Sequence, residues 1–445
     1  MTKALLTVVA FALCAPGARA GSDPERAKFV KEQFRHAWQG YVNYAWGHDS
    51  LKPLSRGAHD WYNGTLLMTP VDALDTMLIM GLDAEARQAK ELIKHRLSFD
   101  QNMEVSVFET TIRILGGLLS SYQRTGDADL LVLADDLGRR MLPAFDSPSR
   151  MPYGVVNLRT GAVSRPRSNP AEIGSLLLEF GTLSRLTGKG EYYARAKTAL
   201  VELFKHASEH GLVGSDFDVE DGAWVDRDSH VGGTIDSYYE YLYKGWLLFG
   251  DADLKAMWDK SIAGVNRFVA DDDNDELWYD HVDMNTGRRK ATLYGSLDAF
   301  FAGLLALSGD LPRARALQES NYKMWTRFGI EPEELDYRSW KIKDPAYHLR
   351  PEIIESAYYL HHFTGDDRYL AMGATFVDDL VKYCKTDTGF AELKSVVTKE
   401  KSDSMESYFF AETLKYAYLL FAPRQTLDPE HEILNTEAHP LKRTW

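Results

Sequence analysis

Hydrophobic residues recur at helical spacing along most of this chain. The clearest stripe follows Ser22-Asp23-Pro24-Glu25, which offers an N-cap side chain, a proline at the first helical position and an early acid. The apolar positions then run through Phe29, Val30, Phe34, Trp38, Tyr41, Val42 and Trp46. This spacing predicts an amphipathic helix, and helical patterns dominate the segments that follow.

Six segments share one plan, which indicates an internal repeat. Each begins with an acidic residue in a stretch that is polar or contains Pro or Gly. A predicted helix rich in apolar and aromatic residues follows, and it usually ends at a turn of the Gly-Asp type. The anchoring acids recur with a nearly constant period, and they are Glu109, Glu172, Asp236, Asp298, Glu352 and Glu406. Such a period holds two helices of about 15–18 residues and two connections, as in arrays of helical pairs.

Turns of a second kind lie between the helical pairs. Short β-like runs flank Thr160-Gly161, Asp221-Gly222, Thr286-Gly287 and Thr388-Gly389, which predicts small hairpins. Each turn comes a short distance before its anchoring acid, so the hairpins and the acids should lie at one end of the pairs. If the array closes into a ring, the acids converge on one mouth. The pattern predicts an all-α toroid with an acid-rich pocket.

The first 20 residues are typical of a cleavable signal peptide. Lys3 precedes an apolar stretch from Ala4 to Pro16, and Ala18-Arg19-Ala20 forms a small-x-small cleavage site. No later stretch approaches the roughly 20 apolar residues that a spanning helix needs. We therefore expect a periplasmic or secreted protein with no membrane anchor, in which residues 21–445 form a single domain. At about 61 residues per repeat, such a length corresponds to seven helical pairs.

Composition excludes several classes of partner. The chain has 51 Lys+Arg against 65 Asp+Glu, and its acidic surface disfavours nucleic acids and anionic membranes. After residue 20 only Cys384 remains, so no internal disulfide can form. No nucleotide fingerprint or Gly-x-Ser-x-Gly elbow occurs. His206 and His210 lack a third ligand and are better interpreted as a solvated helix face than as a zinc site.

The carboxylates are then the remaining candidates for catalytic residues. Glu109, Asp236 and Glu352 stand in apolar surroundings at predicted helix starts, where burial of an acid is costly unless it meets a ligand, a metal or an arginine. Arg113, one turn after Glu109, and Arg350, beside Glu352, are suitable partners. Converging carboxylates without a nucleophilic Ser or Cys indicate glycoside hydrolysis, with one acid protonating the leaving oxygen and one base activating water.

Six motifs in a fixed order extend this picture. They are Val71-Asp72-Ala73-Leu74-Asp75-Thr76-Met77, Phe108-Glu109-Thr-Thr-Ile-Arg113 with Gly116-Gly117, Asp236-Ser-Tyr-Tyr-Glu240, Leu349-Arg350-Pro351-Glu352-Ile-Ile-Glu355, Met405-Glu406-Ser407 through Glu412-Thr413-Leu414-Lys415, and Asn435-Thr436-Glu437-Ala438-His439-Pro440. In these residues the sequence resembles the glycoside hydrolase family 47 α-1,2-mannosidases over nearly all of the chain after residue 20. The resemblance implies an (α/α)7 barrel, which agrees with the seven pairs, and a C-terminal hairpin that enters the barrel.

The resemblance also implies an activity and a set of roles. It predicts an inverting, Ca²⁺-dependent exo-mannosidase that removes terminal α-1,2-linked mannose from oligomannose glycans or mannan. Glu109 would be the general acid, acting through a water, and Glu352 the general base. Asp236 would be a third catalytic carboxylate, and which of Glu109 and Asp236 delivers the proton stays open. Thr436 would bind Ca²⁺. The pocket would be completed by Arg113 and Arg350, which orient the acids, and by Glu172, Glu355, Glu412 and Glu437.

The main departure from the family pattern lies in one segment. Residues 295–303 lack the Pro-Gly and the histidine usual there, which concerns the leaving-group side of the site and the branch preference rather than the chemistry. The leader without an anchor is typical of an exported bacterial member, and we expect a monomer. Two alternatives remain. One is a non-catalytic mannose-binding member of the same fold. The other is a different toroid enzyme, such as a lyase or hydrolase of acidic polysaccharide, which the negative charge disfavours.

Overall fold

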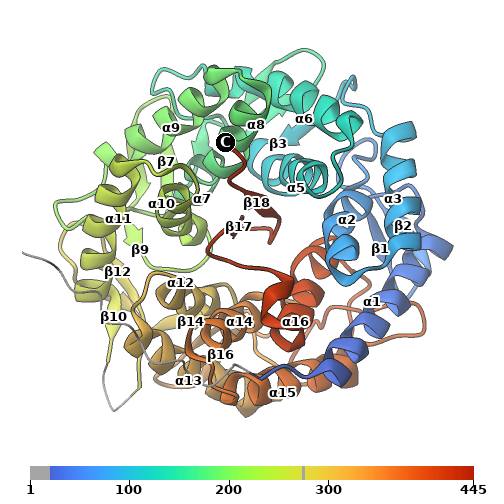
Figure 1. The fold of residues 1–445 in the computed structure, drawn as a ribbon. Coiled ribbons are helices and arrows are strands. Elements are labelled where there is room, and N and C mark those ends of the chain that lie inside the picture. Colours follow the sequence, from blue (N-terminus) through green and yellow to red (C-terminus); the bar gives the residue numbers. More distant parts are fainter. Residues whose placement is uncertain (1–20, 273–275) are drawn as a thin grey trace, which may run out of the picture.

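The computed structural model describes residues 21–272 and 276–445, and its helices form two concentric rings (Figure 1). The predicted signal peptide, residues 1–20, lies outside the described residues. The inner ring consists of α2 (Met68–Met80), α5 (Gly116–Thr125), α8 (Leu177–Thr187), α10 (Asp236–Phe249), α12 (Phe301–Leu307), α14 (Glu352–Thr364) and α16 (Leu414–Phe421). The outer ring consists of α1 (Pro24–Tyr44), α3 (Asp83–Arg96), α6 (Ala128–Met141), α9 (Gly190–Lys205), α11 (Ala252–Gly264), α13 (Leu311–Phe328) and α15 (Arg368–Cys384).

Six inner helices pack against the outer helix that follows them in the chain. The seventh pair joins the two ends of the fold, because α1 packs against α16. The backbone N–H of Asp23 donates to the carbonyl of Phe421 at 2.9 Å, directly at this junction. The ring is therefore closed, and the predicted (α/α)7 barrel is confirmed.

The local signals act as the sequence predicts. The Asp23 side chain caps α1 by accepting from the backbone N–H of Arg26, and Pro24 occupies the first turn. The Gly-Asp turns serve two helices at once. Gly250 ends α10 in the left-handed region at φ 69°, and Asp251 caps α11 by accepting from the Asp253 N–H. One dipeptide thus stops an inner helix and starts an outer one.

Burial separates the two rings. Helix α10 is buried along most of its length, since it packs against the outer ring on one side and the lumen on the other. Helix α6 is buried only along a stripe that contains Leu130, Ala134, Leu137 and Met141. The core is one continuous layer between the rings.

The inner helices are shorter than the repeat predicts, from 7 residues in α12 to 14 in α10. Several are preceded by short segments, which are either single α-helical turns or turns of π-helix or 3-10 helix. These lead-in segments are α4 (Val107–Glu109), the π-helical η1 (Thr110–Leu115), α7 (Pro170–Gly174), the 3-10 helix η5 (Leu297–Phe300) and the π-helical η6 (Phe409–Thr413). Most of them carry residues of the site described below. Further short helices are η2 (Leu142–Phe145), η3 (Val265–Val269) and η7 (Arg424–Thr426).

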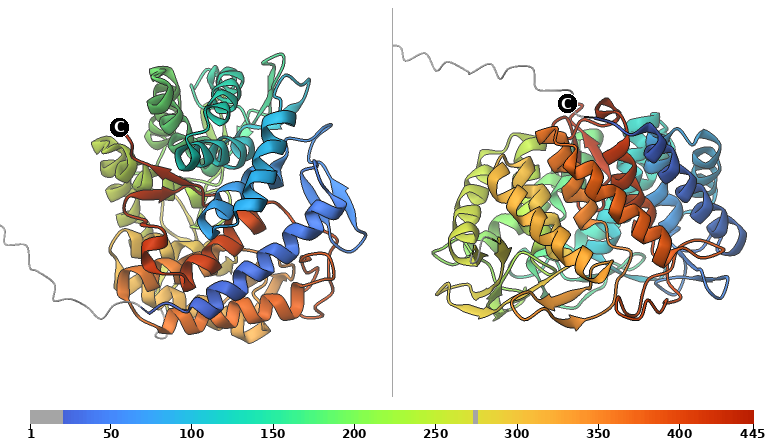
Figure 2. Two further views of the ribbon diagram at one scale, coloured as in Figure 1. Left: turned by 45° about the vertical axis from the view of Figure 1, so that its right-hand side comes forward. Right: turned by 90° about the horizontal axis from the view of Figure 1, so that it is seen from below.

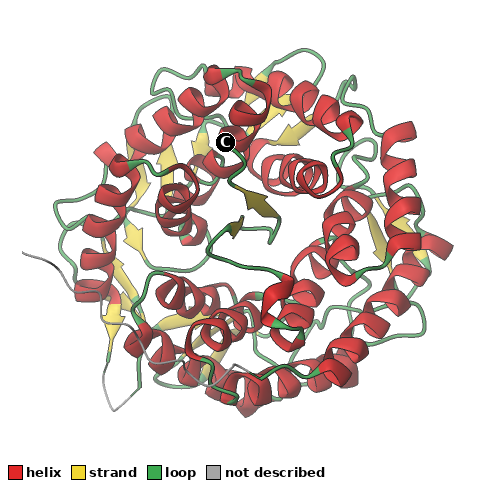
Figure 3. Ribbon diagram, in the orientation of Figure 1, coloured by secondary structure: helices red, strands yellow, loops and turns green. Residues whose placement is uncertain are grey.

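Small antiparallel sheets lie at one end of the barrel (Figures 2 and 3). The strands there are β1 (Ser50–Lys52), β2 (Gly57–His59), β3 (Glu104–Ser106), β4 (Val155–Asn157), β5 (Val163–Ser164), β6 (Arg167–Ser168), β7 (Asp216–Asp218), β8 (Ala223–Asp226), β9 (Asp228–Ser229), β10 (Ala270–Asp271), β11 (Trp278–Tyr279), β12 (His281–Asp283), β13 (Arg289–Ala291), β14 (Leu293–Gly295), β15 (Glu334–Asp336) and β16 (Lys341–Asp344). Three predicted hairpins are confirmed as β4–β5, β7–β8 and β12–β13. The fourth is reduced to the bridge between Lys385 and Phe390, whereas β1–β2 and β15–β16 were not predicted.

These sheets connect neighbouring repeats. Strands β3, β6, β9 and β14 each lead into an inner-ring segment, and each pairs with a strand of a hairpin from elsewhere in the chain. The approach to each of these four inner-ring segments is therefore held by two elements. Within the described residues, no helix is both long enough and apolar enough to span a bilayer.

The C-terminal hairpin occupies the centre of the inner ring (Figure 1). Its strands are β17 (Glu432–Leu434) and β18 (Pro440–Lys442), paired antiparallel. The C-terminus lies at the end of the barrel away from the small sheets (Figure 2). Gly116 and Gly117 make room for this hairpin, because a Cβ on Gly116 would lie 2.7 Å from Asn435 Nδ2.

Candidate active site

A cavity of about 270 Å³ lies where the starts of the inner helices meet the tip of the C-terminal hairpin. All ten residues predicted from the sequence line it: Glu109, Arg113, Glu172, Asp236, Arg350, Glu352, Glu355, Glu412, Thr436 and Glu437. They come from five separate inner segments and from the hairpin, so the ring brings together residues that are far apart in the sequence.

The position of each acid follows from the repeat. Glu109 ends α4, Glu172 lies in α7, and Asp236 and Glu352 are the first residues of α10 and α14. Since every inner helix starts at the same end of the barrel, these acids meet. Two anchoring acids do not line the cavity. Asp298 accepts from the Gly295 N–H at 3.0 Å, and Glu406 accepts from Trp61 Nε1 at 2.8 Å.

Arg113 organises one side of the cavity. Its Nε donates to Glu109 Oε2 at 2.9 Å, one helical turn away, as the sequence predicts. Its Nη1 bonds Glu437 on the hairpin, and the guanidinium lies over the rings of Trp61 and Tyr408 at 5.1 and 5.4 Å. Arg113 is only 7% exposed, so these contacts are well shielded from water.

Arg350 does not pair with Glu352, which corrects the prediction from their adjacency. Its Nη2 donates to Glu333 Oε2 at 2.9 Å and its Nε to Glu333 Oε1 at 3.1 Å. The sequence pattern gives no sign of Glu333 as a partner. Glu352 Oε2 is buried and has no hydrogen-bond partner among the described residues. Burial raises the pKa of Glu352 to about 8, although the nearby Arg350 acts to lower it.

Asp236 is the second acid that favours its protonated form. Burial raises its pKa to about 7, and the nearby carboxylates Glu240 and Asp298 act in the same direction. The backbone N–H of Ser237 donates to Asp236 Oδ1 at 2.7 Å and partly offsets this effect. Glu240, one turn further along α10, is itself paired with Lys244.

Carboxylates crowd the floor of the cavity near Thr436. Burial raises the pKa of Glu355 to about 8, while Lys244 acts to lower it. The Tyr416 hydroxyl donates to Glu355 Oε1 at 3.0 Å. Burial, together with Glu437, Glu352 and Glu355, raises the pKa of Glu412 well above its ordinary value. This concentration of acid favours a bound cation.

The hairpin tip that carries Thr436 is held from several sides. Asn435 Oδ1 accepts from the backbone N–H groups of Glu437 and His439, at 3.0 and 2.7 Å. Asn435 Nδ2 donates to the Ile112 carbonyl at 3.0 Å. Lys415 Nζ donates to the Ala438 carbonyl at 2.6 Å. The tip is therefore ordered, and Thr436 has a fixed place in the cavity.

A network of buried charges supports the tip from below. His439 Nδ1 lies 2.7 Å from Asp75 Oδ2, and its Nε2 lies 3.2 Å from Asp72 Oδ1. Lys415 Nζ lies 2.8 Å from Asp75 Oδ1. Burial acts to lower the pKa of His439, but Asp75 and Asp72 raise it to about 9, so the imidazole is charged at neutral pH. Asp72 and Asp75 belong to the first of the six sequence motifs. The sequence analysis assigned them no role, and the structure shows that they support the hairpin tip.

Sequence reasoning missed several residues that line the cavity. Tyr408 lies beneath both arginines, and Leu297 and Phe300 form part of the wall. Glu240 carried a signal, because it lies one turn after Asp236 in the same motif. Glu172 is at the rim, where it contacts Arg165 Nη2 at 2.9 Å and Ser168 Oγ at 3.0 Å.

Comparison with known proteins connects this arrangement to one family. The model of glycosyl hydrolase family 47 matches residues 33–443. The chain is 38% identical over 464 residues to ER degradation-enhancing alpha-mannosidase-like protein 2 of Homo sapiens, covering 95% of this chain and 78% of that protein. It is 37% identical over 453 residues to the endoplasmic reticulum mannosyl-oligosaccharide 1,2-alpha-mannosidase of Mus musculus, covering 94% and 68%.

Solved structures agree with this relationship. The alpha-1,2-mannosidase from Trichoderma reesei superimposes with a TM-score of 0.87 at 29% identity, covering 95% of this chain and 99% of that one. A D-mannose isomerase has a TM-score of 0.61 at 14% identity, which shows a shared fold alone. From the family match, the identities and the barrel together, this chain belongs to glycosyl hydrolase family 47.

Proposed function

We propose that this chain is an exo-acting, inverting α-1,2-mannosidase that hydrolyses terminal α-1,2-linked mannose from oligomannose glycans or mannan. The observation that carries the proposal is the meeting of Glu109, Asp236 and Glu352 in one cavity of about 270 Å³. Inversion needs one carboxylic acid that gives a proton to the leaving oxygen and one carboxylate that takes a proton from water. The tip of the C-terminal hairpin, which carries Thr436 and Glu437, lines this cavity, and a cavity with such a floor would admit only the end of a glycan, which suits exo-cleavage.

Glu352 is the proposed base. Its Oε2 has no hydrogen-bond partner among the described residues, and a cation bound in the cavity would offset the effect of burial and favour the carboxylate form that accepts a proton from the attacking water. For the acid, the structure supports Asp236 more than Glu109. Asp236 holds its proton up to about pH 7, whereas the Glu109 carboxylate already accepts a hydrogen bond from Arg113. Delivery from Glu109 through a water is the alternative route. Arg113 would orient Glu109 and Glu437 through its bonds to them, whereas Arg350 is bonded to Glu333 and would act on Glu352 through its charge.

The residues near Thr436 fit a hard cation such as Ca²⁺. Thr436 offers a hydroxyl and a carbonyl oxygen, and Glu355, Glu412 and Glu437 offer carboxylates that could hold waters around the ion. The crowding that raises the pKa of Glu412 would be relieved by a divalent charge. When bound, Ca²⁺ would orient sugar hydroxyls and favour distortion of the ring.

We further propose that residues 1–20 are a cleaved signal peptide, that residues 21–445 form one catalytic domain, and that the mature chain is a monomer acting in the periplasm or outside the cell. The relatives named above come from eukaryotes, so a bacterial origin has only the leader in its favour. N-terminal sequencing of the exported product and size-exclusion chromatography with light scattering test these points.

The direct test is hydrolysis of α-1,2-mannobiose by the full chain, with α-1,6-mannobiose as the linkage control. We expect cleavage of the first substrate alone, loss of activity after treatment with chelator, and recovery with Ca²⁺. Proton NMR should show β-mannose as the first product. Prompt release of the α anomer would overturn the inverting assignment.

A mannose-binding role without catalysis is the second candidate, because several relatives are named only as mannosidase-like. It predicts saturable binding of mannobiose with no turnover under any metal condition. The proton donor is tested separately. An aryl mannoside with a good leaving group should restore activity to the donor variant, because its leaving oxygen needs no proton. We expect this restoration in Asp236→Asn and not in Glu109→Gln.

A further inference from the structure

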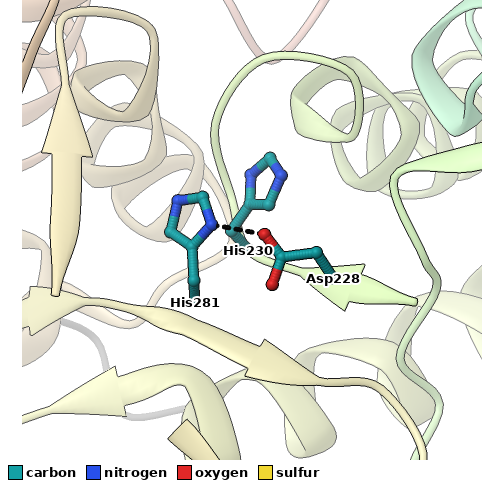
Figure 4. Close-up of side chains that lie close together, drawn as sticks. All are labelled: Asp228, His230 and His281. Atoms are coloured by element: carbon teal, nitrogen blue, oxygen red, sulfur yellow. Dashed lines mark hydrogen bonds and ion pairs between the residues drawn. The ribbon is translucent and has the colours of Figure 1, made fainter. Parts of the chain in front are cut away.

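Two histidines and an aspartate, side chains of the types that ligate metals, lie together outside the cavity, where β9 pairs with β12. The two strands pair antiparallel, with Ser229 opposite Val282. Side chains alternate between the two faces of a sheet. Ser229 and Val282 therefore point to one face, and their neighbours in sequence, Asp228, His230 and His281, point to the other. Figure 4 shows the three side chains close together, with the Asp228 carboxylate facing the His281 ring.

The donor atoms are close enough to share one ion. One nitrogen of each histidine and one carboxylate oxygen lie within 4.8 Å of one another. His281 Nδ1 is 2.6 Å from Asp228 Oδ2, and the two imidazole rings stack with centroids 4.3 Å apart. Within the described residues, no second group of three or more His, Cys, Asp or Glu side chains has such geometry.

His230 provides an independent observation. The residue is 7% exposed, and its Nδ1 has no hydrogen-bond partner among the residues that the structure describes. A buried ring nitrogen without a partner is costly, and the cost is removed if the nitrogen binds a ligand.

We propose that Asp228, His230 and His281 bind a divalent transition-metal ion, with Zn²⁺ as the best fit. Two imidazole nitrogens and one carboxylate oxygen are a donor set that suits Zn²⁺, with water as the fourth ligand. Ca²⁺ prefers six to eight oxygen ligands, so this site is distinct from the one proposed at Thr436. The ion takes the place of the proton between His281 Nδ1 and Asp228 Oδ2, and that proton is released to solvent.

Lys290 is the main opposing feature. Its Nζ lies 3.0 Å from Asp228 Oδ1, and this positive charge weakens the site. It contacts the other carboxylate oxygen, however, and it also faces Asp226 at 3.7 Å. Asp228 Oδ2 can therefore ligate an ion while Lys290 stays where it is.

The ion would join two repeats near the cavity. β9 leads through Gly232 and Gly233 to Asp236, and Gly233 lines the cavity. A metal between β9 and β12 would fix this approach to α10. We therefore expect Zn²⁺ to raise the melting temperature of the metal-free chain.

The test uses the full chain after removal of metals with a chelator. Calorimetric titration with ZnCl2 should show about one saturable equivalent, and CoCl2 should give visible d–d bands of a low-coordinate site. His230→Ala and His281→Ala should each weaken Zn²⁺ binding by at least about 10-fold, and Ca²⁺ should not compete. His48→Ala is the matched control, since it removes a His–Asp pair of similar length, 2.9 Å to Asp60, and should change nothing.

Circular dichroism checks that each variant folds. If the alanine variants do not fold, Asp228→Asn replaces them, and X-ray absorption of the zinc-loaded wild type counts imidazole ligands without any substitution. Absence of saturable Zn²⁺ binding by the wild type would overturn the proposal. Unchanged binding in the folded variants, or a zinc shell without two imidazoles, would overturn it as well.

Discussion

Two sets of buried charges lie on different sides of the cavity, and they differ in how they are compensated. The set beneath the hairpin tip is Asp72, Asp75, Lys415 and His439, in which each acid contacts a cation. At the starts of α10 and α14, Asp236, Glu352 and Glu355 form no ion pair among the described residues. The paired set is fully buried, whereas Asp236 and Glu352 keep partial exposure to the cavity, so the exposed fraction alone does not explain why the pKa is lowered for Asp75 and raised for Asp236 and Glu352.

Pairing decides the protonation of each set. Burial acts to raise the pKa of Asp75, but Lys415 and His439 hold it well below its ordinary value. Burial without a partner raises the pKa values of Asp236 and Glu352 to about 7 and about 8. The paired set thus keeps fixed charges and supports the hairpin, while the unpaired set can gain or lose a proton near neutral pH.

The largest effect is expected from the unpaired set. Glu352→Gln keeps the shape of the side chain but cannot take a proton from water, so turnover of α-1,2-mannobiose should fall by about 10²–10⁴-fold. Binding of mannobiose, measured by calorimetry, should change little. Turnover close to that of the wild type would remove Glu352 from the mechanism.

The paired set should respond in stability instead. Lys415→Met leaves Asp75 buried with one cation fewer, and the free energy of unfolding should fall by about 3–5 kcal/mol. Urea denaturation measures this change. Lys189→Met is the matched control, because it breaks the exposed pair with Asp135 and should cost less than about 1 kcal/mol. Equal losses in the two variants would contradict the comparison.

A smaller effect should appear as a pH dependence. Because the folded pKa of Glu352, about 8, exceeds its ordinary value of 4.5, the folded chain binds more protons in that window and its stability falls as the pH rises. In chelator, Glu352→Gln should gain roughly 1–3 kcal/mol over the wild type between about pH 5 and pH 8. His439 also loses stabilisation as the pH approaches 9, but it does so in both proteins and cancels. Urea denaturation at a series of pH values measures the free energy of unfolding of both proteins. A constant difference between the wild type and Glu352→Gln across this range would contradict the prediction.

The smallest effect is expected at the rim. Glu172 lines the cavity and contacts Arg165 and Ser168, and it is not among the groups that most affect the pKa of Asp236 or Glu352. Glu172→Gln should raise the KM for mannobiose a few-fold, about 1 kcal/mol or less, with kcat nearly unchanged. Initial-rate kinetics separate the two constants. A large loss of kcat would place Glu172 with the reacting groups.

The repeat explains why much of the fold and site could be predicted. A Gly that ends one helix and an Asp that caps the next are local signals, and they recur at Gly126-Asp127 and Gly250-Asp251. The spacing of the acids then gives the number of pairs and the shared end of the barrel. Once the ring closes, Glu109, Asp236 and Glu352 must meet, because each lies at the start of an inner-ring segment at the same end of the barrel.

Other features depend on contacts that no local pattern encodes. Arg350 stands beside Glu352 in sequence, yet its fork geometry matches Glu333, which the β15–β16 sheet brings alongside. His230 and His281 are far apart in the sequence and meet only because β9 pairs with β12. The lead-in turns also shorten the inner helices, an effect that hydrophobic periodicity does not register.

The pairing of α1 with α16 determines when the barrel can close during synthesis of the chain. Helix α1 leaves the ribosome long before α16, so the ring cannot close until the chain has been made through α16. The hairpin of β17 and β18 follows later still and brings the floor of the cavity with it. A chain that ends before β17 would therefore lack the residues that the hairpin contributes to the cavity, among them Thr436 and Glu437, and should not show the proposed activity.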